Sequence, residues 1–228
     1  GGINNYGGGI VTLNRCTVSG NLAWEGGGIH NDGGSGINRL TLNNSTVSGN
    51  SATGDGGGIY TRVDILGCHD LALVNCTITG NTADSDNNDT GDGGGVYNNA
   101  GSTEVYNTLV AGNHDLSDGT SHPDWSMHLG SYGYNLIGDT AGINRTEYDN
   151  AGTDLLNTNP QLGALADNGG ETETHAFAVD SPALDAVPVA QCTLATDQRG
   201  VARPQRADCD IGAYERENEA PDAVDDMA

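Results

Sequence analysis

The chain has 228 residues and a net charge of −23, and its 8 basic residues are all arginines. Binding along a nucleic acid or an anionic membrane requires clustered positive charge, so this composition excludes both as expected partners. The 36 glycines, 6 prolines and 1 phenylalanine exclude collagen and favour a narrow core of aliphatic and small side chains. Because no apolar run reaches about 18 residues, we expect no membrane insertion by this segment.

One short pattern recurs along the first half of the chain. It occurs as RCTVSGN (15–21), NSTVSGN (44–50), NCTITGN (75–81) and NTLVAGN (107–113). Glycine triplets interleave with it from positions 7, 26, 56 and 93, and the loops between the two patterns vary in length. Repeated strand-like segments separated by variable loops are typical of a solenoid.

The residues within each repeat alternate with the period of a β-strand. In the second repeat we expect Ser45 and Val47 to face inward and Thr46 to be an exposed strand residue. The aligned inward columns are Leu13, Leu42, Leu73 and Val105; Cys16, Ser45, Cys76 and Thr108; and Val18, Val47, Ile78 and Val110. Columns this uniform predict an all-β fold in which about eight coils of three strands stack as a parallel β-helix.

Each repeat ends with an asparagine that directly follows a glycine. Stacked asparagines can hydrogen-bond through their side-chain amides, as they do in other stacked β structures. The predicted ladder consists of Asn21, Asn50, Asn81 and Asn113. The glycine triplets are expected to form the next corner of each coil, where a Cβ would collide with the neighbouring coil.

Oxygen donors are densest in the loop ADSDNNDTGDGGG, residues 83–95. Carboxylate and amide oxygens on a flexible loop are the ligands that Ca²⁺ prefers. The spacing is not that of an EF-hand, because the glycine comes late and no glutamate closes the loop. Two interpretations stay open, a solvated insertion and a calcium site. We expect the protein to require no cofactor, and calcium is the candidate if one is bound. The ligands of that site would be Asp84, Asp86, Asn88, Asp89 and Asp92.

A second polar group lies in the long insertion after Asn113. Three histidines (His114, His122 and His128) occur there with three aspartates (Asp115, Asp118 and Asp124). Imidazole and carboxylate groups together suit a transition metal. No His-x-x-x-His or Cys-x-x-Cys spacing supports such a site, so a solvated insertion is the alternative.

The chain contains 5 cysteines, an odd number that excludes complete pairing within one chain. Cys192 and Cys209 lie close together in a loop-rich terminal segment, so they are the candidate disulfide, which would fit an extracellular setting. Cys16 and Cys76 share an inward column two coils apart, too far for a disulfide. We expect these two, and Cys68, to be buried free thiols.

Two parts of the sequence resemble known bacterial families. The Gly-Gly-Gly-Ile and Ser-Gly-Asn repeats are similar to right-handed parallel β-helix repeat proteins and to the repeats of polymorphic outer-membrane proteins. The segments NPQLGALADNGGETETHAFAVDSPALDA and TDQRGVARPQRADCDIGAYE, within residues 155–215, resemble the choice-of-anchor Q domain. The tail NEAPDAVDD resembles the start of a cadherin-like or Ig-like module. Together these resemblances imply a large secreted or cell-surface bacterial protein.

The predicted organisation has three parts. Residues 1–139 form the right-handed β-helix repeats, residues 140–216 form the last coils and a disulfide-closed C-terminal cap, and residues 217–228 form a linker. The chain thus reads as a fragment of a longer protein. We expect the cap to cover the open end of the solenoid, where unpaired strand edges invite aggregation. Its ion pairs would come from Arg199, Arg203, Arg206, Asp197, Asp208 and Asp210.

The resulting functional prediction is a non-catalytic extracellular or cell-surface module with a structural or adhesive role, able to self-associate through open coil edges. Its expected partners are other surface-protein chains, copies of itself or extracellular glycans. The alternatives are a carbohydrate-active lyase or hydrolase and a glycan-binding module. A lyase commonly uses a basic side chain, but the chain has no lysine and Arg15, Arg39 and Arg62 do not share one column. A hydrolase needs paired acids, whereas the outward positions carry Thr and Ser.

Overall fold

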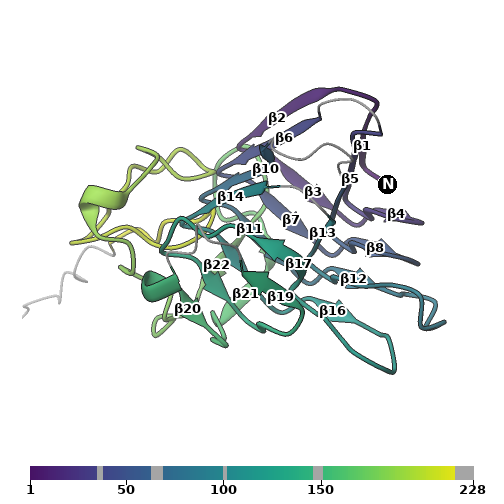
Figure 1. Cartoon of the computed structure of the whole chain (residues 1–228). Helices are drawn as coiled ribbons and strands as arrows, with labels where there is room; N and C mark the ends of the chain where they lie inside the picture. Colours follow the sequence, from purple (N-terminus) through teal and green to yellow (C-terminus); the bar gives the residue numbers. More distant parts are fainter. Residues whose placement is uncertain (35–37, 63–68, 100–101, 146–150, 219–228) are drawn as a thin grey trace, which may run out of the picture.

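The computed structural model describes residues 1–34, 38–62, 69–99, 102–145 and 151–218, and shows an all-β parallel solenoid (Figure 1). The strands form four parallel sheets, called A to D, and each complete turn contributes one strand to each of them. Sheets B and D have 4 strands each. The predicted parallel β-helix is therefore confirmed. The prediction of about eight coils is wrong, because the described residues form four complete turns, followed by two partial turns with strands in sheets A and C only. Each turn also has a fourth short strand, directly after the ladder asparagine.

Sheet A follows the glycine triplets and has 6 strands: β1 (Ile3–Tyr6), β5 (Ile29–Asp32), β9 (Ile59–Arg62), β13 (Val96–Asn99), β17 (Trp125–Leu129) and β19 (Ile143–Arg145). Sheet B contains β2 (Ile10–Asn14), β6 (Arg39–Asn43), β10 (His69–Val74) and β14 (Ser102–Tyr106). Sheet C contains β3 (Thr17–Ser19), β7 (Thr46–Ser48), β11 (Thr77–Thr79), β15 (Leu109–Val110), β18 (Leu136–Ile137) and β20 (Leu155–Leu156). Sheet D contains β4 (Leu22–Ala23), β8 (Ser51–Ala52), β12 (Thr82–Ala83) and β16 (His114–Asp115).

The predicted inward columns fill the interior of the solenoid. In sheet C the register pairs Val18 with Val47, Val47 with Ile78 and Ile78 with Val110. These side chains belong to one continuous hydrophobic cluster, which also includes the fully buried Trp125. Stacking like on like keeps each layer the same width, so a narrow core can be packed mainly with aliphatic side chains.

The predicted asparagines are hydrogen-bonded in series. The Nδ2 group of Asn21 donates to Oδ1 of Asn50, Asn50 donates to Asn81, and Asn81 donates to Asn113, each at 2.9 Å. Each acceptor oxygen also receives the backbone N–H of the preceding ladder residue at 3.0 Å. The series ends on a carboxylate, because Asn113 donates to Oδ1 of Asp124 at 2.8 Å. A carboxylate only accepts hydrogen bonds, so Asp124 suits the acceptor end of the ladder.

The glycine triplets form corners at which adjacent turns approach closely. A Cβ built on Gly57 would lie 2.5 Å from the carbonyl oxygen of Gly94 in the next turn, and would also overlap the backbone of Thr82. The first glycine of the triplet, Gly56, has φ +68°, a conformation that glycine adopts without steric cost. The corner therefore needs glycine for two separate reasons, backbone conformation and space.

The C-terminal segment, residues 151–218, lies along the side of the stacked turns, at the outer face of sheet C (Figure 1). Gln198 donates through Nε2 to the hydroxyl of Thr17 and accepts through Oε1 from Thr46, in the first and second turns. In the third turn the hydroxyl of Thr77 accepts the backbone N–H of Ala213. The expected cap over the solenoid end is therefore wrong for these residues, and Thr46 is buried rather than exposed.

This segment has its own core and its own secondary structure. It contains the helical turns η1 (Ala151–Thr153) and η2 (Val189–Gln191) and the antiparallel strands β21 (Leu162–Ala166) and β22 (Thr174–Phe177). Its apolar side chains, Phe177, Val187 and Ile211 among them, pack against Leu109 and Leu136 of sheet C. The segment is thus bound to the solenoid through apolar contacts as well as hydrogen bonds.

Covalent and ionic links close the C-terminal segment. The predicted disulfide between Cys192 and Cys209 is present, with Cα atoms 6.0 Å apart. Arg199 pairs with Asp197 at 2.9 Å as expected, whereas Arg203 pairs at 2.7 Å with Glu215, which the prediction did not include. Arg206 lies 3.5 Å from Asp185, which the prediction also did not include, and the carboxylates of Asp208 and Asp210 accept backbone N–H groups.

The unpaired cysteines behave differently from one another. Cys76 is a fully buried free thiol, and burial raises its pKa to about 12. Cys16 is also free but only partly buried, because it lies in the first turn. Cys68 lies outside the described residues, as do residues 219–228 of the predicted linker.

Candidate metal centre

Two neighbouring loops of the solenoid form an acidic recess. They follow β12 and β16 in the third and fourth turns and project beyond the ends of these strands (Figure 1). The hydroxyl of Ser117 donates to the carbonyl of Gly91 at 2.7 Å, and the backbone N–H of Asp118 donates to Oδ1 of Asp89 at 2.7 Å. These contacts hold the two loops against each other across the boundary between turns.

A pocket of about 500 Å³ opens between these loops. Four of its lining residues are aspartates: Asp55, Asp89, Asp92 and Asp118. None of the residues that line the pocket is basic. Carboxylates gathered around a recess produce a negative potential that concentrates cations at its mouth.

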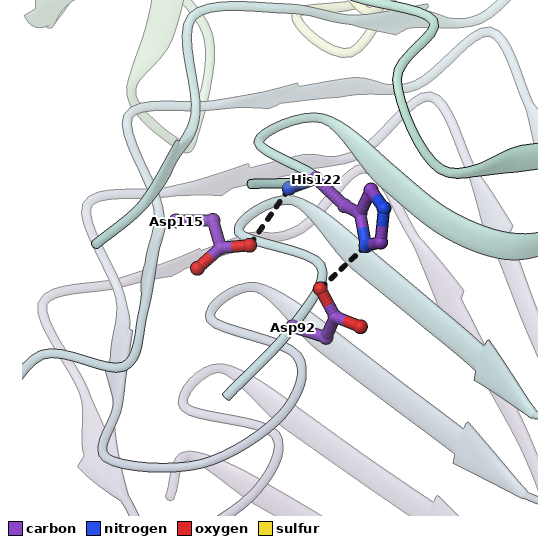
Figure 2. A group of neighbouring side chains, drawn as sticks. All are labelled: Asp92, Asp115 and His122. Carbon is purple, nitrogen blue, oxygen red and sulfur yellow. Dashed lines mark hydrogen bonds and ion pairs between the residues drawn. The ribbon is translucent and has the colours of Figure 1, made fainter. Parts of the chain in front are cut away.

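Asp92, Asp115 and His122 lie together beside this pocket (Figure 2). Nδ1 of His122 is 2.5 Å from Oδ1 of Asp92, and the backbone N–H of His122 donates to Oδ2 of Asp115 at 2.7 Å. One nitrogen or oxygen atom from each side chain lies within 4.8 Å of the other two. Asp92 directly precedes a glycine triplet, Asp115 ends β16, and His122 comes from the loop after it. The arrangement offers one imidazole and two carboxylates from two adjacent turns.

Burial and neighbouring negative charge weaken the acidity of the carboxyl groups at this site. Burial raises the pKa of Asp92, while His122 opposes the shift and Asp115 adds to it. Burial, followed by the charges of Asp92 and Glu25, raises the pKa of Asp55 to about 6. Because burial removes water from the carboxylates of Asp92 and Asp55, binding of a proton or a cation to them is favoured.

Asp55→Asn is expected to stabilise the protein above pH 6. The folded-state pKa of Asp55 lies above the ordinary aspartate value of 3.8, so the folded state binds the extra proton and loses stability as the pH rises from 4 to 6. Asparagine has no charge to desolvate, so the melting temperature at pH 8 should rise by about 2 °C, a figure discounted for the partial exposure of the group. Melting curves recorded with a chelator at pH 4 and pH 8 measure the effect.

Asp180→Asn, a change at an exposed aspartate of the C-terminal segment, is the matched control. It removes the same formal charge without removing a partly buried carboxylate. Equal stabilisation by the two variants at pH 8 would mean that net charge, and not the position of Asp55, is responsible.

The structure uses the predicted calcium ligands in different ways. Asp84 is buried, and its carboxylate accepts the backbone N–H groups of Asn88 at 2.9 Å and Asp89 at 3.1 Å. Oδ2 of Asp86 accepts the side-chain amide of Asn88 at 2.9 Å. Asp92 is the member of the set that belongs to the three-residue group with Asp115 and His122. These contacts fold the loop on itself, and calcium binding by the five residues stays a prediction.

The fold separates the three histidines and three aspartates that the sequence placed together in the insertion after Asn113. Of the histidines, His122 joins the group with Asp92 and Asp115, while the side chain of His114 is exposed and His128 lies in β17. Of the aspartates, Asp115 joins the group, Asp118 lines the pocket and Asp124 ends the asparagine ladder. Sequence reasoning missed the pairing of His122 with Asp92, which lie 30 residues apart. His122, Pro123 and Asp124 stand where the earlier turns carry a glycine triplet, so the repeat pattern did not mark this position.

Comparison with known proteins supports the repeat assignment. The model of the Chlamydia polymorphic membrane protein repeat matches residues 44–62, which span β7 to β9 and include Asn50 and a glycine triplet. No curated protein and no solved structure matches the chain. The resemblance of residues 155–215 to the choice-of-anchor Q domain stays a prediction. Within the described residues, no helix reaches the length and hydropathy needed to span a membrane. The chain is a parallel β-helix repeat protein, one stretch of which matches the polymorphic membrane protein repeat.

Proposed function

We propose that the chain is a non-catalytic structural module of a bacterial surface protein, in which the β-helix serves as a shaft. The observation that carries this proposal is the use made of the matched repeat, residues 44–62. Val47 fills the core, Asn50 joins the ladder, and Gly57 allows adjacent turns to approach. The repeated residues thus serve the stacking of turns, and a family named for membrane proteins shares the repeat.

Surface labelling of intact cells tests the location. Cells that express the full-length gene should bind an antibody raised against this chain without permeabilisation, and external protease should remove the signal. Labelling only after permeabilisation would contradict a surface role.

Activity assays test the non-catalytic part of the proposal. Acidic and neutral polysaccharides offered with Ca²⁺ should give no absorbance from unsaturated uronides and no new reducing ends. Sustained turnover by the purified chain would establish the enzyme alternative. Saturable binding on a glycan array, without turnover, would instead establish a glycan-binding module.

We further propose that the module associates with a second copy of itself through its first turn. Within the described residues, strands β1 to β4 each pair with a neighbouring strand on one side only. Four large apolar side chains lie on this turn with 65% to 76% of their surface exposed: Tyr6, Ile10, Leu22 and Trp24. Open strand edges beside exposed apolar side chains favour pairing with another β-structure.

Sedimentation velocity over a range of protein concentrations tests this association. The unmodified chain should form a larger species as its concentration rises, and the double variant Ile10→Lys with Leu22→Lys should sediment as a monomer. Val179→Lys is the matched control, because Val179 is 74% exposed but lies in the C-terminal segment. A monomeric unmodified chain at every concentration, or equal disruption by the control, would contradict association through the first turn.

A further inference from the structure

We infer that Asp92, Asp115 and His122 bind one divalent first-row transition metal ion, which joins the loops of the third and fourth turns. A structural shaft requires no metal, so this site goes beyond the proposed function. It also differs from the calcium site expected in residues 83–95, because two of its three ligands come from the following turn and one is an imidazole.

The ligand atoms have the type and spacing that such an ion needs. Zinc binds histidine nitrogen at about 2.0–2.1 Å and carboxylate oxygen at about 2.0–2.2 Å, so two ligand atoms on one ion lie at most about 4.3 Å apart. The three atoms of this group lie within 4.8 Å of one another, so small side-chain rotations bring them around a common centre. Imidazole favours zinc, nickel, copper or iron over calcium and magnesium, which prefer oxygen ligands alone.

The backbone holds His122 in place independently of any metal. Its N–H donates to Asp115, and its carbonyl accepts the N–H of Gly94 at 3.2 Å. Gly142 packs against the imidazole ring so closely that no Cβ would fit there. Asp115 is held as well, because its Oδ1 accepts the N–H and the hydroxyl of Ser117. Ligands that other groups hold in position lose little conformational freedom on binding a metal.

The contact between His122 and Asp92 marks the position that the ion would take. Nδ1 of His122 and Oδ1 of Asp92 are 2.5 Å apart and hydrogen-bonded. An ion bound by both atoms would replace this hydrogen bond with one metal–ligand bond to each atom, and Nδ1 would then carry no proton. Because a proton and the ion compete for the same atoms, metal affinity should rise with pH.

The adjacent pocket supplies a route from solvent to the site. Asp92 and Ser117 line the pocket of about 500 Å³, and Asp55, Asp89 and Asp118 surround its opening with negative charge. The whole chain carries a net charge of −23, so cations are attracted toward it from a distance at low salt. Attraction of this kind does not distinguish metals, and the choice among them must come from His122.

Calorimetric titration of the full chain with Zn²⁺ tests the site. The protein is first treated with a chelator, dialysed into physiological salt and alkylated at its free thiols, so that thiolates contribute no zinc binding. We expect one ion per chain, with weaker binding at pH 6 than at pH 7.5. His122→Gln and Asp92→Asn should each weaken binding by about tenfold or more.

Two matched variants keep the same kinds of side chain outside the group. His114→Gln removes an exposed histidine of the same insertion, and Asp118→Asn removes a pocket aspartate that is not a proposed ligand; both should leave the affinity within about twofold. Visible absorption of Co²⁺ provides an independent readout, because the spectrum reports coordination by imidazole and should change in His122→Gln. Circular dichroism of the metal-free variants shows whether each remains folded.

Three results would overturn the inference. Unchanged zinc affinity in folded His122→Gln would remove the imidazole from the site. Equal weakening by Asp118→Asn and Asp92→Asn would indicate diffuse attraction to the acidic loops. Competition by Ca²⁺ as effective as that of Co²⁺ would indicate an oxygen-only site.

Discussion

Gly57→Ala is expected to lower the free energy of unfolding by about 3 kcal/mol or more, because it forces two stacked turns apart. The added Cβ would lie 2.5 Å from the carbonyl oxygen of Gly94 and would overlap the backbone of Thr82. Both obstacles are backbone atoms in the adjacent turn, where no side chain can rotate away. Urea denaturation followed by circular dichroism measures the change.

Gly119→Ala is the matched control for this prediction. A Cβ at Gly119 meets no atom within 4 Å, and no left-handed φ is recorded there. We expect its stability to stay within about 0.5 kcal/mol of the unmodified chain. If Gly57→Ala were as stable as Gly119→Ala, the turns would not be in close contact at the glycine corner.

Asn81→Ala is expected to cost about 3 kcal/mol or more, because it breaks the ladder at its buried centre. The side chain of Asn81 accepts from the amide and the backbone N–H of Asn50, and it donates to Asn113 and to the carbonyl of Val47. Alanine leaves these buried groups without that partner, and each unsatisfied buried group costs about 1–3 kcal/mol. Thermal and urea unfolding both measure the loss.

Two further variants separate the ladder from a simple loss of volume. Asn21→Ala removes the first rung, which is partly exposed, and should cost only about 1 kcal/mol. Asn81→Asp keeps the acceptor for Asn50 but has no N–H for Asn113, so it should be destabilising at neutral pH despite its similar size. Equal stability of Asn21→Ala and Asn81→Ala would show that the ladder contributes no more at its centre than at its edge.

The interior of the solenoid could be predicted because its signal is local and repeated. Val47 and Ile78 occupy the same place in two copies of one short pattern, and alternation within a strand assigns them to the same face. Stacking of identical turns then brings equivalent residues together, as the hydrogen bond between Asn50 and Asn81 illustrates. The disulfide between Cys192 and Cys209 was likewise predictable, from proximity in a loop-rich segment.

The outer face of sheet C could not be predicted in the same way. Thr46 and Thr77 fit an exposed strand and a covered one equally well, because a hydroxyl can hydrogen-bond to water or to protein. The structure covers them with Gln198 and Ala213, more than 130 residues further along the chain. The replacement of threonine by Leu109 at the equivalent position was a signal of this, since Leu109 packs in the second core.

The parallel β-helix, its core columns, its asparagine ladder and its glycine corners could all be predicted, because they follow from a short pattern repeated at similar spacing. The position of the C-terminal segment along the side of the turns, and the contact of Asp92 with His122, became known from the folded structure. Both depend on contacts between unrepeated segments, which no local period encodes. The pairing of β12 with β16 in the third and fourth turns brings the two loops that follow these strands together, and it is there that the inferred metal ligands meet.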